Sequence, residues 1–155
     1  MTTVLTYGTF DLFHVGHVNL LERIARLGDR VVVGVSTDEF NAVKGKRSVM
    51  SYADRSRIVS AVKGVDLVIP ENDWGQKPDD IREHGVDLFV MGDDWAGKFD
   101  ELTSLCEVRY LPRTAGVSTT GLKQMLKVLD PSHLDEMKQA LDTLTRLLAH
   151  YGELR

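Results

Sequence analysis

The sequence predicts an α/β protein built on a doubly wound parallel sheet, and two observations support that prediction. Short apolar runs of strand length alternate along the chain with segments whose apolar residues recur at helical spacing. The run RVVVGVS at 30–36 is almost wholly apolar, which is typical of a strand covered on both faces. Strands that alternate with helices form parallel sheets through right-handed crossovers. We therefore expect a Rossmann-like sheet with helices on both faces, followed by a C-terminal helix.

The first strand–helix–strand unit lies within the first 36 residues. TVLTY (3–7) is a short β-rich run, and apolar residues then recur at helical spacing from Val15 to Leu27, where Gly28 stops the helix. The second strand is the run at 30–36. The segment GTFDLFHVGH (8–17) therefore falls in the loop between the first strand and the first helix.

The same alternation continues along the chain. Helices are predicted over 51–64, with Ser51 as N-cap, over 78–85 and over 121–129, and strands over 65–70, 86–92 and 106–112. Sheets of this kind bind ligands at the carboxyl ends of their strands. The loops that follow the strands should gather at that edge, called the carboxyl edge below. They are GTFDLFHVGH, STDEFNAVKGKRS (36–48), ENDWGQK (71–77), GDDWAGK (92–98) and PRTAGVSTT (112–120).

The tail has a different pattern. Beyond residue 130 the apolar residues recur at spacings of three and four, which is the a/d pattern of a coiled-coil seam. They are Leu134, Met137, Leu141, Leu144, Leu148 and Tyr151. We expect a main domain over 1–130 and a helical extension over 131–155 that packs on its own domain or on a partner subunit.

Composition narrows the class of protein. A chain of 155 residues has the size of one domain, and its net charge of −4 argues against a nucleic-acid-binding protein, which usually carries a basic face. A single cysteine, Cys106, excludes an intrachain disulfide and a cysteine-based zinc cluster. The N-terminus lacks the layout of a signal peptide, and no apolar run approaches a membrane span. We therefore expect a cytoplasmic protein that binds neither nucleic acid nor membrane.

The two histidines of GTFDLFHVGH allow three interpretations. A zinc site needs at least a third ligand, and no other histidine or cysteine falls in a loop of the carboxyl edge, so no metal ligands are predicted. Two histidines that cap a helix are the better interpretation of HVGH in isolation. Its position after a strand and before a helix instead favours an anion, because the backbone N–H groups and the helix dipole attract negative charge there.

Other loops of the same edge carry cations and hydroxyl groups. KGKR contributes Lys44, Lys46 and Arg47, for which a phosphate-binding role and plain solvated surface are about equally supported. The last loop offers Arg113 and three hydroxyl residues at the head of a helix, where N-capping alone would need only one hydroxyl. The acids Asp11, Asp38, Asp66 and Asp94 could orient these cations, hold a metal or cap turns. Together the loops suggest a polyphosphate ligand.

These residues resemble a known family. His14-Val15-Gly16-His17 after the first strand, together with VSTT at 117–120, is similar to the paired signature of the HxGH nucleotidyltransferases, which include cytidylyltransferases and pantetheine-phosphate adenylyltransferases. YGTFDLFHVGH, VSTDEFN, MGDDWAGKFD and YLPRT make the chain resemble the glycerol-3-phosphate cytidylyltransferases over roughly residues 3–128. The resemblance implies transfer of a cytidylyl group from CTP to glycerol 3-phosphate by in-line attack, giving CDP-glycerol and pyrophosphate.

The resemblance also implies roles for individual residues. Nucleotide-binding residues would be Thr9, Phe10, His14, Val15, Gly16, His17, Lys46, Lys63, Arg113, Thr114, Ala115, Gly116, Val117, Ser118, Thr119 and Thr120. Acceptor-binding residues would be Lys44, Lys77, Asp11, Asp38, Arg55, Trp74 and Asp94. Catalysis would rest on His14, His17, Lys44, Lys46 and Arg113. Mg²⁺ would bridge the nucleotide phosphates rather than occupy an all-protein site.

One departure and several alternatives remain at this point. The family pattern R-x-V-D is here KGVD, and Lys63 lacks the bidentate fork with which arginine holds phosphate. The family commonly forms homodimers, which the apolar seam of the tail could extend. The alternatives are another phosphorylated acceptor, such as ethanolamine phosphate or an FMN-like phosphate, ATP as donor, or a nucleotide-binding regulator without catalysis.

Overall fold

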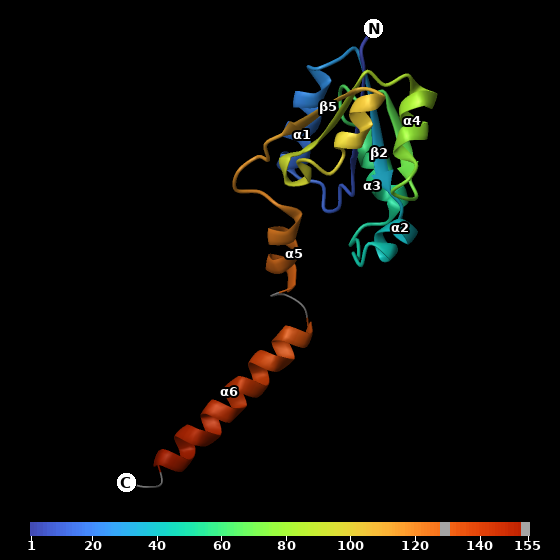
Figure 1. Ribbon diagram of the computed structural model, residues 1–155. Helices are drawn as coiled ribbons and strands as arrows, with labels where there is room; N and C mark the ends of the chain where they lie inside the picture. The colour runs from blue at the N-terminus through green and yellow to red at the C-terminus, as the bar shows by residue number, and fades with distance from the viewer. Residues whose placement is uncertain (128–130, 153–155) are drawn as a thin grey trace. The chain divides into compact units, whose positions relative to one another are not determined.

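The structure is a computed structural model that describes residues 1–127 and 131–152 (Figure 1). The chain divides into two compact units, Met1–Val117 and Ser118–Arg155, each of which is described by itself. The predicted domain boundary after residue 130 falls at the segment 128–130, outside the described residues, and stays a prediction.

The first unit contains one parallel sheet of five strands, in the order β3-β2-β1-β4-β5. All four neighbouring pairs are parallel. The strands are β1 (Thr3–Gly8), β2 (Arg30–Ser36), β3 (Leu67–Glu71), β4 (Leu88–Gly92) and β5 (Glu107–Leu111). The predicted parallel sheet is therefore confirmed, with each strand within two residues of its expected bounds.

The helices predicted over 15–27, 51–64 and 78–85 are present in the first unit, together with three shorter helical segments that were not predicted. Ser51 is the N-cap of α3, as predicted, and its side chain accepts a hydrogen bond from the backbone N–H of Asp54. The helical segments are α1 (Val15–Ala25), α2 (Asp38–Val43), α3 (Tyr52–Ser60), α4 (Lys77–His84), η1 (Asp93–Trp95) and η2 (Asp100–Ser104).

The segment after β2 differs from the prediction, because it holds the short helix α2 rather than only a loop. The Thr37 hydroxyl caps this helix by accepting the backbone N–H of Phe40 at 3.2 Å. Asp38 and Glu39 lie in its first turn, where negative charge interacts favourably with the helix dipole.

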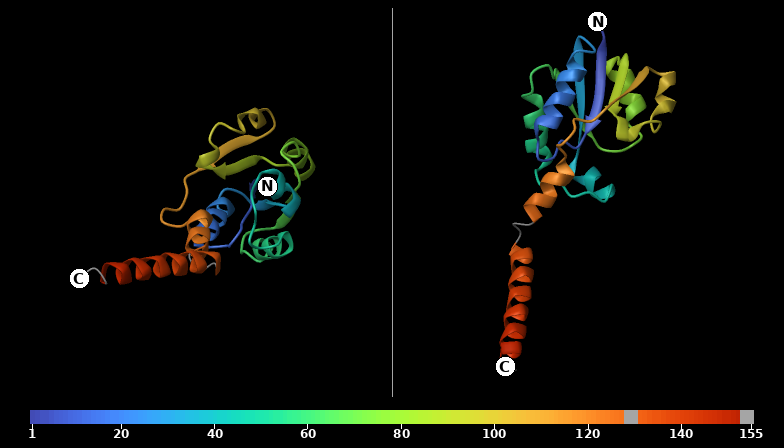
Figure 2. Two further views of the ribbon diagram at one scale, coloured as in Figure 1. Left: turned by 90° about the horizontal axis from the view of Figure 1, so that it is seen from below. Right: turned by 90° about the vertical axis from the view of Figure 1, so that its left-hand side faces the viewer.

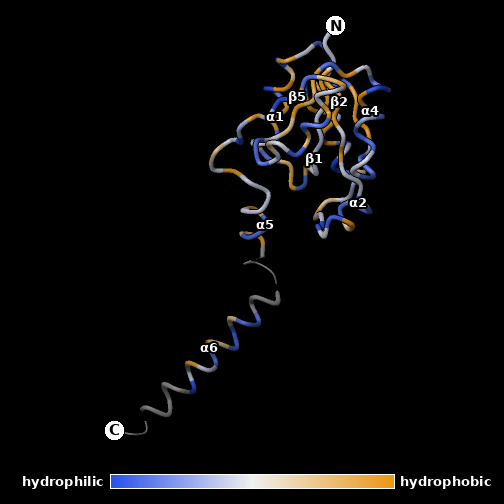
Figure 3. The backbone as a smooth tube through the Cα atoms, in the orientation of Figure 1, coloured by the Kyte–Doolittle hydropathy of each residue, from blue (hydrophilic) through white to orange (hydrophobic). Residues whose placement is uncertain are grey.

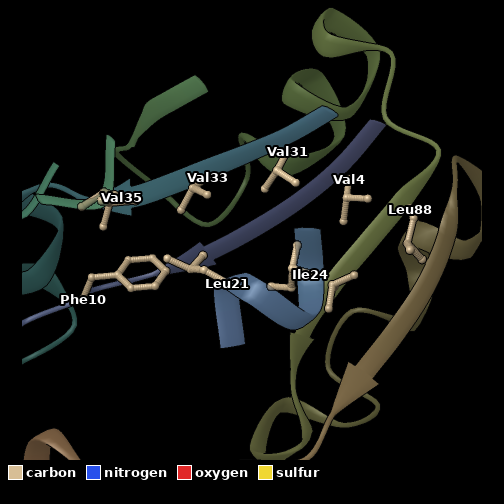
Figure 4. Packing of buried hydrophobic residues seen from close by; sticks show 10 residues of the cluster. Val4, Phe10, Leu21, Ile24, Val31, Val33, Val35 and Leu88 are labelled. Atoms are coloured by element: carbon tan, nitrogen blue, oxygen red, sulfur yellow. The ribbon is translucent and has the colours of Figure 1, made fainter. Parts of the chain in front are cut away.

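Alternation along the strands builds two hydrophobic cores, one on each face of the sheet. Val31, Val33 and Val35 of β2 pack on one face with Leu21 and Ile24 of α1 (Figure 4). On the opposite face the buried side chains from the strands pack with others from α4 and η2; this cluster is Leu5, Tyr7, Val32, Ile81, Val86, Phe89, Met91, Phe99 and Leu102. The sheet lies between helices on both sides, as Figure 2 shows, and hydrophobic residues concentrate along its strands (Figure 3).

The chain order reverses at β1. From β1 the chain runs outward through β2 to β3, and it later returns to place β4 on the other side of β1, followed by β5. A parallel sheet binds its ligand at such a switch point, outside the carboxyl ends of the strands. The loops after β1 and β4 therefore border the expected ligand site.

The second unit consists of α5 (Thr119–Lys127) and α6 (Pro131–Gly152). Three seam residues of α6 are described with their side chains: Met137, Leu141 and Leu144 are 62%, 63% and 57% exposed. Orange and blue alternate along the coloured middle part of α6 in Figure 3, as an amphipathic helix requires. The side chains of Leu134, Leu148 and Tyr151 lie outside the described residues. Among the described helices, none combines the length and apolarity needed to cross a membrane.

Candidate active site at the carboxyl edge

The two histidines of the first loop hold each other in place at the start of α1. His14 is the N-cap, and its Nδ1 accepts the backbone N–H of Gly16 at 3.0 Å. The backbone N–H of His14 donates to Nδ1 of His17 at 3.2 Å, which completes a capping box. The two rings stack with their centroids 3.9 Å apart. The capping interpretation and the anion interpretation are therefore compatible, because capping uses only one nitrogen of each ring.

These hydrogen bonds fix the tautomer of both neutral imidazoles. Since each Nδ1 accepts a backbone N–H, each neutral ring carries its proton on Nε2, an assignment made from the hydrogen-bond pattern. Burial lowers the pKa of His14, and burial together with the neighbouring His14 lowers the pKa of His17 to about 4. At neutral pH the loop therefore presents two neutral Nε2–H groups that can donate hydrogen bonds to phosphate oxygens.

Glycine and phenylalanine support this arrangement. A Cβ at position 16 would lie 2.7 Å from Cε1 of His14, so only glycine lets the His14 ring fold over the helix start. Phe10 is buried and its ring packs edge-on to His17 at 5.4 Å between centroids. The backbone of Phe10 and Leu12 lies in the left-handed region, with φ of 52° and 47°. Such strained backbone is concentrated at functional sites.

Arg55 ties the first loop to the second. Its side chain is fully buried and donates to the backbone oxygens of Thr9 at 2.6 Å and Met50 at 3.1 Å. It also pairs with the Asp38 carboxylate at 2.8 Å. The backbone N–H of Tyr52 and the Arg55 guanidinium together lower the pKa of Asp38.

Asp11 joins the first loop to the segment just before α3. Its carboxylate is buried and accepts the backbone N–H groups of Val49 at 2.8 Å and Met50 at 3.0 Å. The structure therefore places Asp11, Asp38 and Arg55, which the resemblance assigns to acceptor binding, in contacts that shape the loops.

A buried charge cluster lies where β2 and β3 end. Glu71 accepts hydrogen bonds from Lys77 Nζ at 2.7 Å and from the Ser36 hydroxyl at 2.7 Å. Lys44 Nζ donates to the Ser36 hydroxyl at 2.8 Å and lies 3.6 Å from Glu71 Oε2, the oxygen that also accepts the Ser36 hydroxyl. Two ammonium groups against one carboxylate leave this cluster with a net positive charge. Burial is the largest influence on Lys44 and lowers its pKa.

Aromatic rings surround the two ammonium groups. Lys44 Nζ lies 4.3 Å from the centroid of Phe40 and 5.5 Å from that of Trp74. Lys77 Nζ lies 4.5 Å from Tyr7, 5.1 Å from Trp74 and 5.5 Å from Phe99. Trp74, which is 47% exposed, is the ring that both lysines share.

Arg113 and Asp94 pair on the other side of the switch point. The Arg113 guanidinium forms a two-pronged contact with Asp94, with Nε 3.3 Å from Oδ1 and Nη2 2.5 Å from Oδ2. The loop that follows Arg113 lies against α1. The Thr114 hydroxyl is 3.5 Å from Asn19 Nδ2, and Val117 Cβ is 3.9 Å from the position that a Cβ of Gly16 would take.

Lys46 and Arg47 are exposed and line an open hollow of about 400 Å³ together with Asp38, Ala42, Gly45 and Ser48. The backbone N–H of Lys46 donates to the carbonyl of Asn41 at 2.8 Å. Val15 at the head of α1 is also exposed. Ala115 and Gly116 follow Arg113 in the same exposed loop, and Gly116 has φ of 81°.

Two predicted residues, Lys63 and Asp66, lie away from the carboxyl edge. Lys63 and Asp66 precede β3, so they lie at the opposite, amino edge of the sheet, where Asp66 accepts the backbone N–H of Val31 at 2.7 Å. Ser118, Thr119 and Thr120 belong to the second unit. There the Ser118 hydroxyl accepts the backbone N–H of Gly121 at 3.0 Å, as an N-cap does.

Sequence reasoning missed Glu71 and Ser36. The sequence signal was slight: Glu71 is one carboxylate directly after an apolar strand, and Ser36 ends the strand before it. Among the described residues, the one group of three side chains that could hold a metal ion is Asp80, Glu83 and His84 on α4, away from the histidine loop in sequence.

Comparison with known proteins agrees with this geometry. The family model described as Cytidylyltransferase-like matches residues 5–125. The chain therefore belongs to the cytidylyltransferase-like family. Within it the chain groups with the glycerol-3-phosphate cytidylyltransferases. That of Bacillus subtilis (strain 168) is 57% identical over 124 residues, covering 80% of this chain and 96% of the relative.

Two further matches extend the comparison. The glycerol-3-phosphate cytidylyltransferase of Staphylococcus aureus (strain NCTC 8325 / PS 47) is 53% identical over 126 residues, covering 81% of this chain and 96% of the relative. Among solved structures, the lipopolysaccharide core biosynthesis protein from Thermoplasma volcanium GSS1 matches with a TM-score of 0.63 at 25% identity. That match covers 74% of this chain and 98% of the other.

Proposed function

We propose that this protein transfers the cytidylyl group of CTP to glycerol 3-phosphate, giving CDP-glycerol and pyrophosphate. The observation that carries the proposal is the pairing, on one sheet edge, of two neutral histidines at a helix start with a buried, net-positive lysine cluster. Relatives that are more than half identical bear the name of this activity and match across most of both chains.

The reaction needs positioning and charge stabilisation rather than a covalent enzyme intermediate. An oxygen of the acceptor phosphate forms a bond to the α-phosphorus of CTP. The bond from that phosphorus to the oxygen of the leaving group breaks, and pyrophosphate departs with the electron pair. Nε2–H groups of His14 and His17 donate to the oxygens on which negative charge builds, which is the effect expected of preorganised donors.

The remaining residues divide between the two reactants. Lys44 and Lys77 bind the acceptor phosphate, and Trp74 lies beside them. Lys46 and Arg113 bind the triphosphate, and the loop residues from Thr114 to Val117 lie beside the nucleotide. Arg113 would exchange its Asp94 partner for phosphate, which a guanidinium also binds through two parallel hydrogen bonds.

Mg²⁺ is part of the proposal because it neutralises the charge of the triphosphate. The carboxylates described at this edge fit a metal held mainly by phosphate oxygens and water, since Glu71 pairs with two lysines and Asp94 pairs with Arg113.

We also propose that the protein is a cytoplasmic homodimer. CTP, the donor, is a metabolite of the cell interior. The exposed seam residues Met137, Leu141 and Leu144 of α6 could pair with the same residues of a second copy. If the dimer forms through this seam, Leu141→Asp should weaken it. Light scattering would then show a lower oligomeric mass. An unchanged mass places any dimer contact elsewhere.

Pyrophosphate release tests the reaction. Either CTP or ATP is supplied with glycerol 3-phosphate, ethanolamine phosphate or FMN, and the nucleotide product is identified by mass spectrometry. CTP with glycerol 3-phosphate should be the productive pair. Activity with ATP alone contradicts the donor, and activity only with another phosphate contradicts the acceptor. CTP binding without any product would indicate a regulator rather than an enzyme.

A further inference from the structure

Lys44 and Lys77, the two lysines of the buried charge cluster, occupy positions that a cationic ligand would otherwise take. Rings of Trp, Tyr and Phe attract cations to their faces, and cages of such rings bind quaternary ammonium ligands. Here Lys44 Nζ lies over Phe40 at 4.3 Å, and Lys77 Nζ lies over Tyr7 at 4.5 Å, with Trp74 near both. The protein therefore fills its own aromatic cage with ammonium groups.

Glu71 is the residue that holds both groups there. It is buried, 3% exposed, and its two carboxylate oxygens face different lysines. Ser36 bridges the Lys44 side, because its hydroxyl contacts both Lys44 Nζ and Glu71. Since one carboxylate offsets only one of two ammonium groups, the cluster keeps a positive charge for an anion while both lysines stay fixed over the rings.

We propose that Glu71 is a positioning residue that fixes Lys44 and Lys77 over the aromatic rings, so that the acceptor site takes the phosphate ester of an uncharged polyol and rejects that of an amino alcohol. The inference rests on the proposed function and adds the basis of acceptor choice. An amino-alcohol phosphate has its own cation, and the faces that would bind that cation are occupied by like charge.

The test compares glycerol 3-phosphate with choline phosphate as acceptors. Lys77→Met and Lys44→Met each remove one ammonium group from the aromatic rings while Glu71 keeps one lysine partner. The ratio of kcat/KM for glycerol 3-phosphate to kcat/KM for choline phosphate should fall by about threefold to thirtyfold, which is the range of a cation–π contact. The lost phosphate contact lowers both values alike and cancels in the ratio. Lys98→Met is the matched control, because Lys98 Nζ also lies over a tryptophan, Trp95 at 5.5 Å, outside the Glu71 cluster. Its ratio should equal that of the wild type.

A second measurement addresses Glu71 itself. Glu71→Gln removes the charge that raises the pKa of Lys44, while burial and the neighbouring Lys46 and Lys77 continue to lower it. The alkaline limb of kcat/KM for glycerol 3-phosphate should therefore move to lower pH. Glu39→Gln, an exposed glutamate on α2, is the control and should leave the profile unchanged.

The outcomes separate the two proposals. Wild-type protein that forms no CDP-glycerol contradicts the proposed function. Wild-type protein that forms it, with the acceptor ratio unchanged in both methionine variants, contradicts only the inference about acceptor choice. Thermal unfolding and choline phosphate binding by calorimetry are measured for each variant. A folded variant that lacks turnover and binds choline phosphate no better than the wild type also overturns the inference.

Discussion

The segments VDLVIPENDW (65–74) and VDLFVMGDDW (86–95) have similar sequences and start alike, but they end in different surroundings. Asp66 and Asp87 do the same thing at the amino edge: each accepts the backbone N–H of a neighbouring strand, from Val31 at 2.7 Å and Thr3 at 2.8 Å. The two segments come together at the carboxyl edge, where the ring centroids of Trp74 and Trp95 lie 5.8 Å apart.

The differences lie at the strand ends. Where the first segment has Glu71, which binds two lysines, the second has Gly92, which is the N-cap of η1. A Cβ at position 92 would lie 2.7 Å from Oδ1 of Asp94, so this glycine lets Asp94 turn toward Arg113. Asp73, the counterpart of Asp94, instead accepts the backbone N–H of Gly75. Strand starts thus hold the sheet together, whereas strand ends differ because each contributes to a different part of the site.

The largest expected effect follows from removing a histidine of the carboxyl edge. His14→Asn keeps an acceptor for the Gly16 N–H but removes the Nε2 donor, and His17→Ala removes the second donor. We expect kcat to fall roughly 10²- to 10³-fold in each. Steady-state kinetics measures this, with thermal unfolding to verify the fold. His84→Ala, a histidine of α4, is the control, and equal losses in all three variants would contradict the roles of His14 and His17.

The main effect of removing Arg55 should be a loss of stability. Arg55→Met removes hydrogen bonds to Thr9, Met50 and Asp38, and we expect the free energy of unfolding to fall by about 3 kcal/mol. Urea unfolding measures the change. Arg57→Met on the exposed face of the same helix should cost little. A folded Arg55→Met protein of unchanged stability would mean that the loops hold without this clamp.

The strands, their parallel pairing and the loops of the edge could be predicted, because strand and helix periodicity with one crossover rule determine them. HVGH could be placed at a helix start on the same grounds. The role of Glu71 could not be predicted, since it depends on lysines 27 and 6 positions away that only the folded sheet brings together. Nor could Asp11 be identified as a loop clamp, because its partners are backbone N–H groups, which have no sequence signature.

The histidine pair also predicts how stability depends on pH. The pKa of His17 in the folded protein is about 4, below its ordinary value of about 6.5 in the unfolded chain. Between these values the unfolded state binds more protons, so the stabilisation is complete above pH 6.5 and is lost as the pH falls through 4. The melting temperature should decrease over this interval, less steeply in His17→Ala. Identical slopes would mean that His17 titrates normally.

Smaller effects are expected at the amino edge. Asp66→Asn and Asp87→Asn each weaken one hydrogen bond to a strand N–H, and each should lower the free energy of unfolding by about 1 kcal/mol. Turnover per folded molecule should stay at the wild-type value, because neither carboxylate lies at the carboxyl edge. Denaturant unfolding and kinetics on the same samples test this equivalence. A large loss of turnover in Asp66→Asn alone would break the symmetry between the two segments.

Lys63→Arg should have the smallest effect on kinetics, and it tests whether this position contributes to nucleotide binding. The resemblance assigns Lys63 to the nucleotide, and arginine would restore the bidentate phosphate contact of the family pattern. The structure instead places Lys63, exposed, in the turn before β3 at the edge opposite the histidines. A side chain there cannot reach phosphates bound at the start of α1, so KM for CTP should change less than about twofold, within the range of an ordinary surface substitution. A KM several-fold lower in Lys63→Arg, with kcat unchanged, would show that nucleotide binding involves the amino edge.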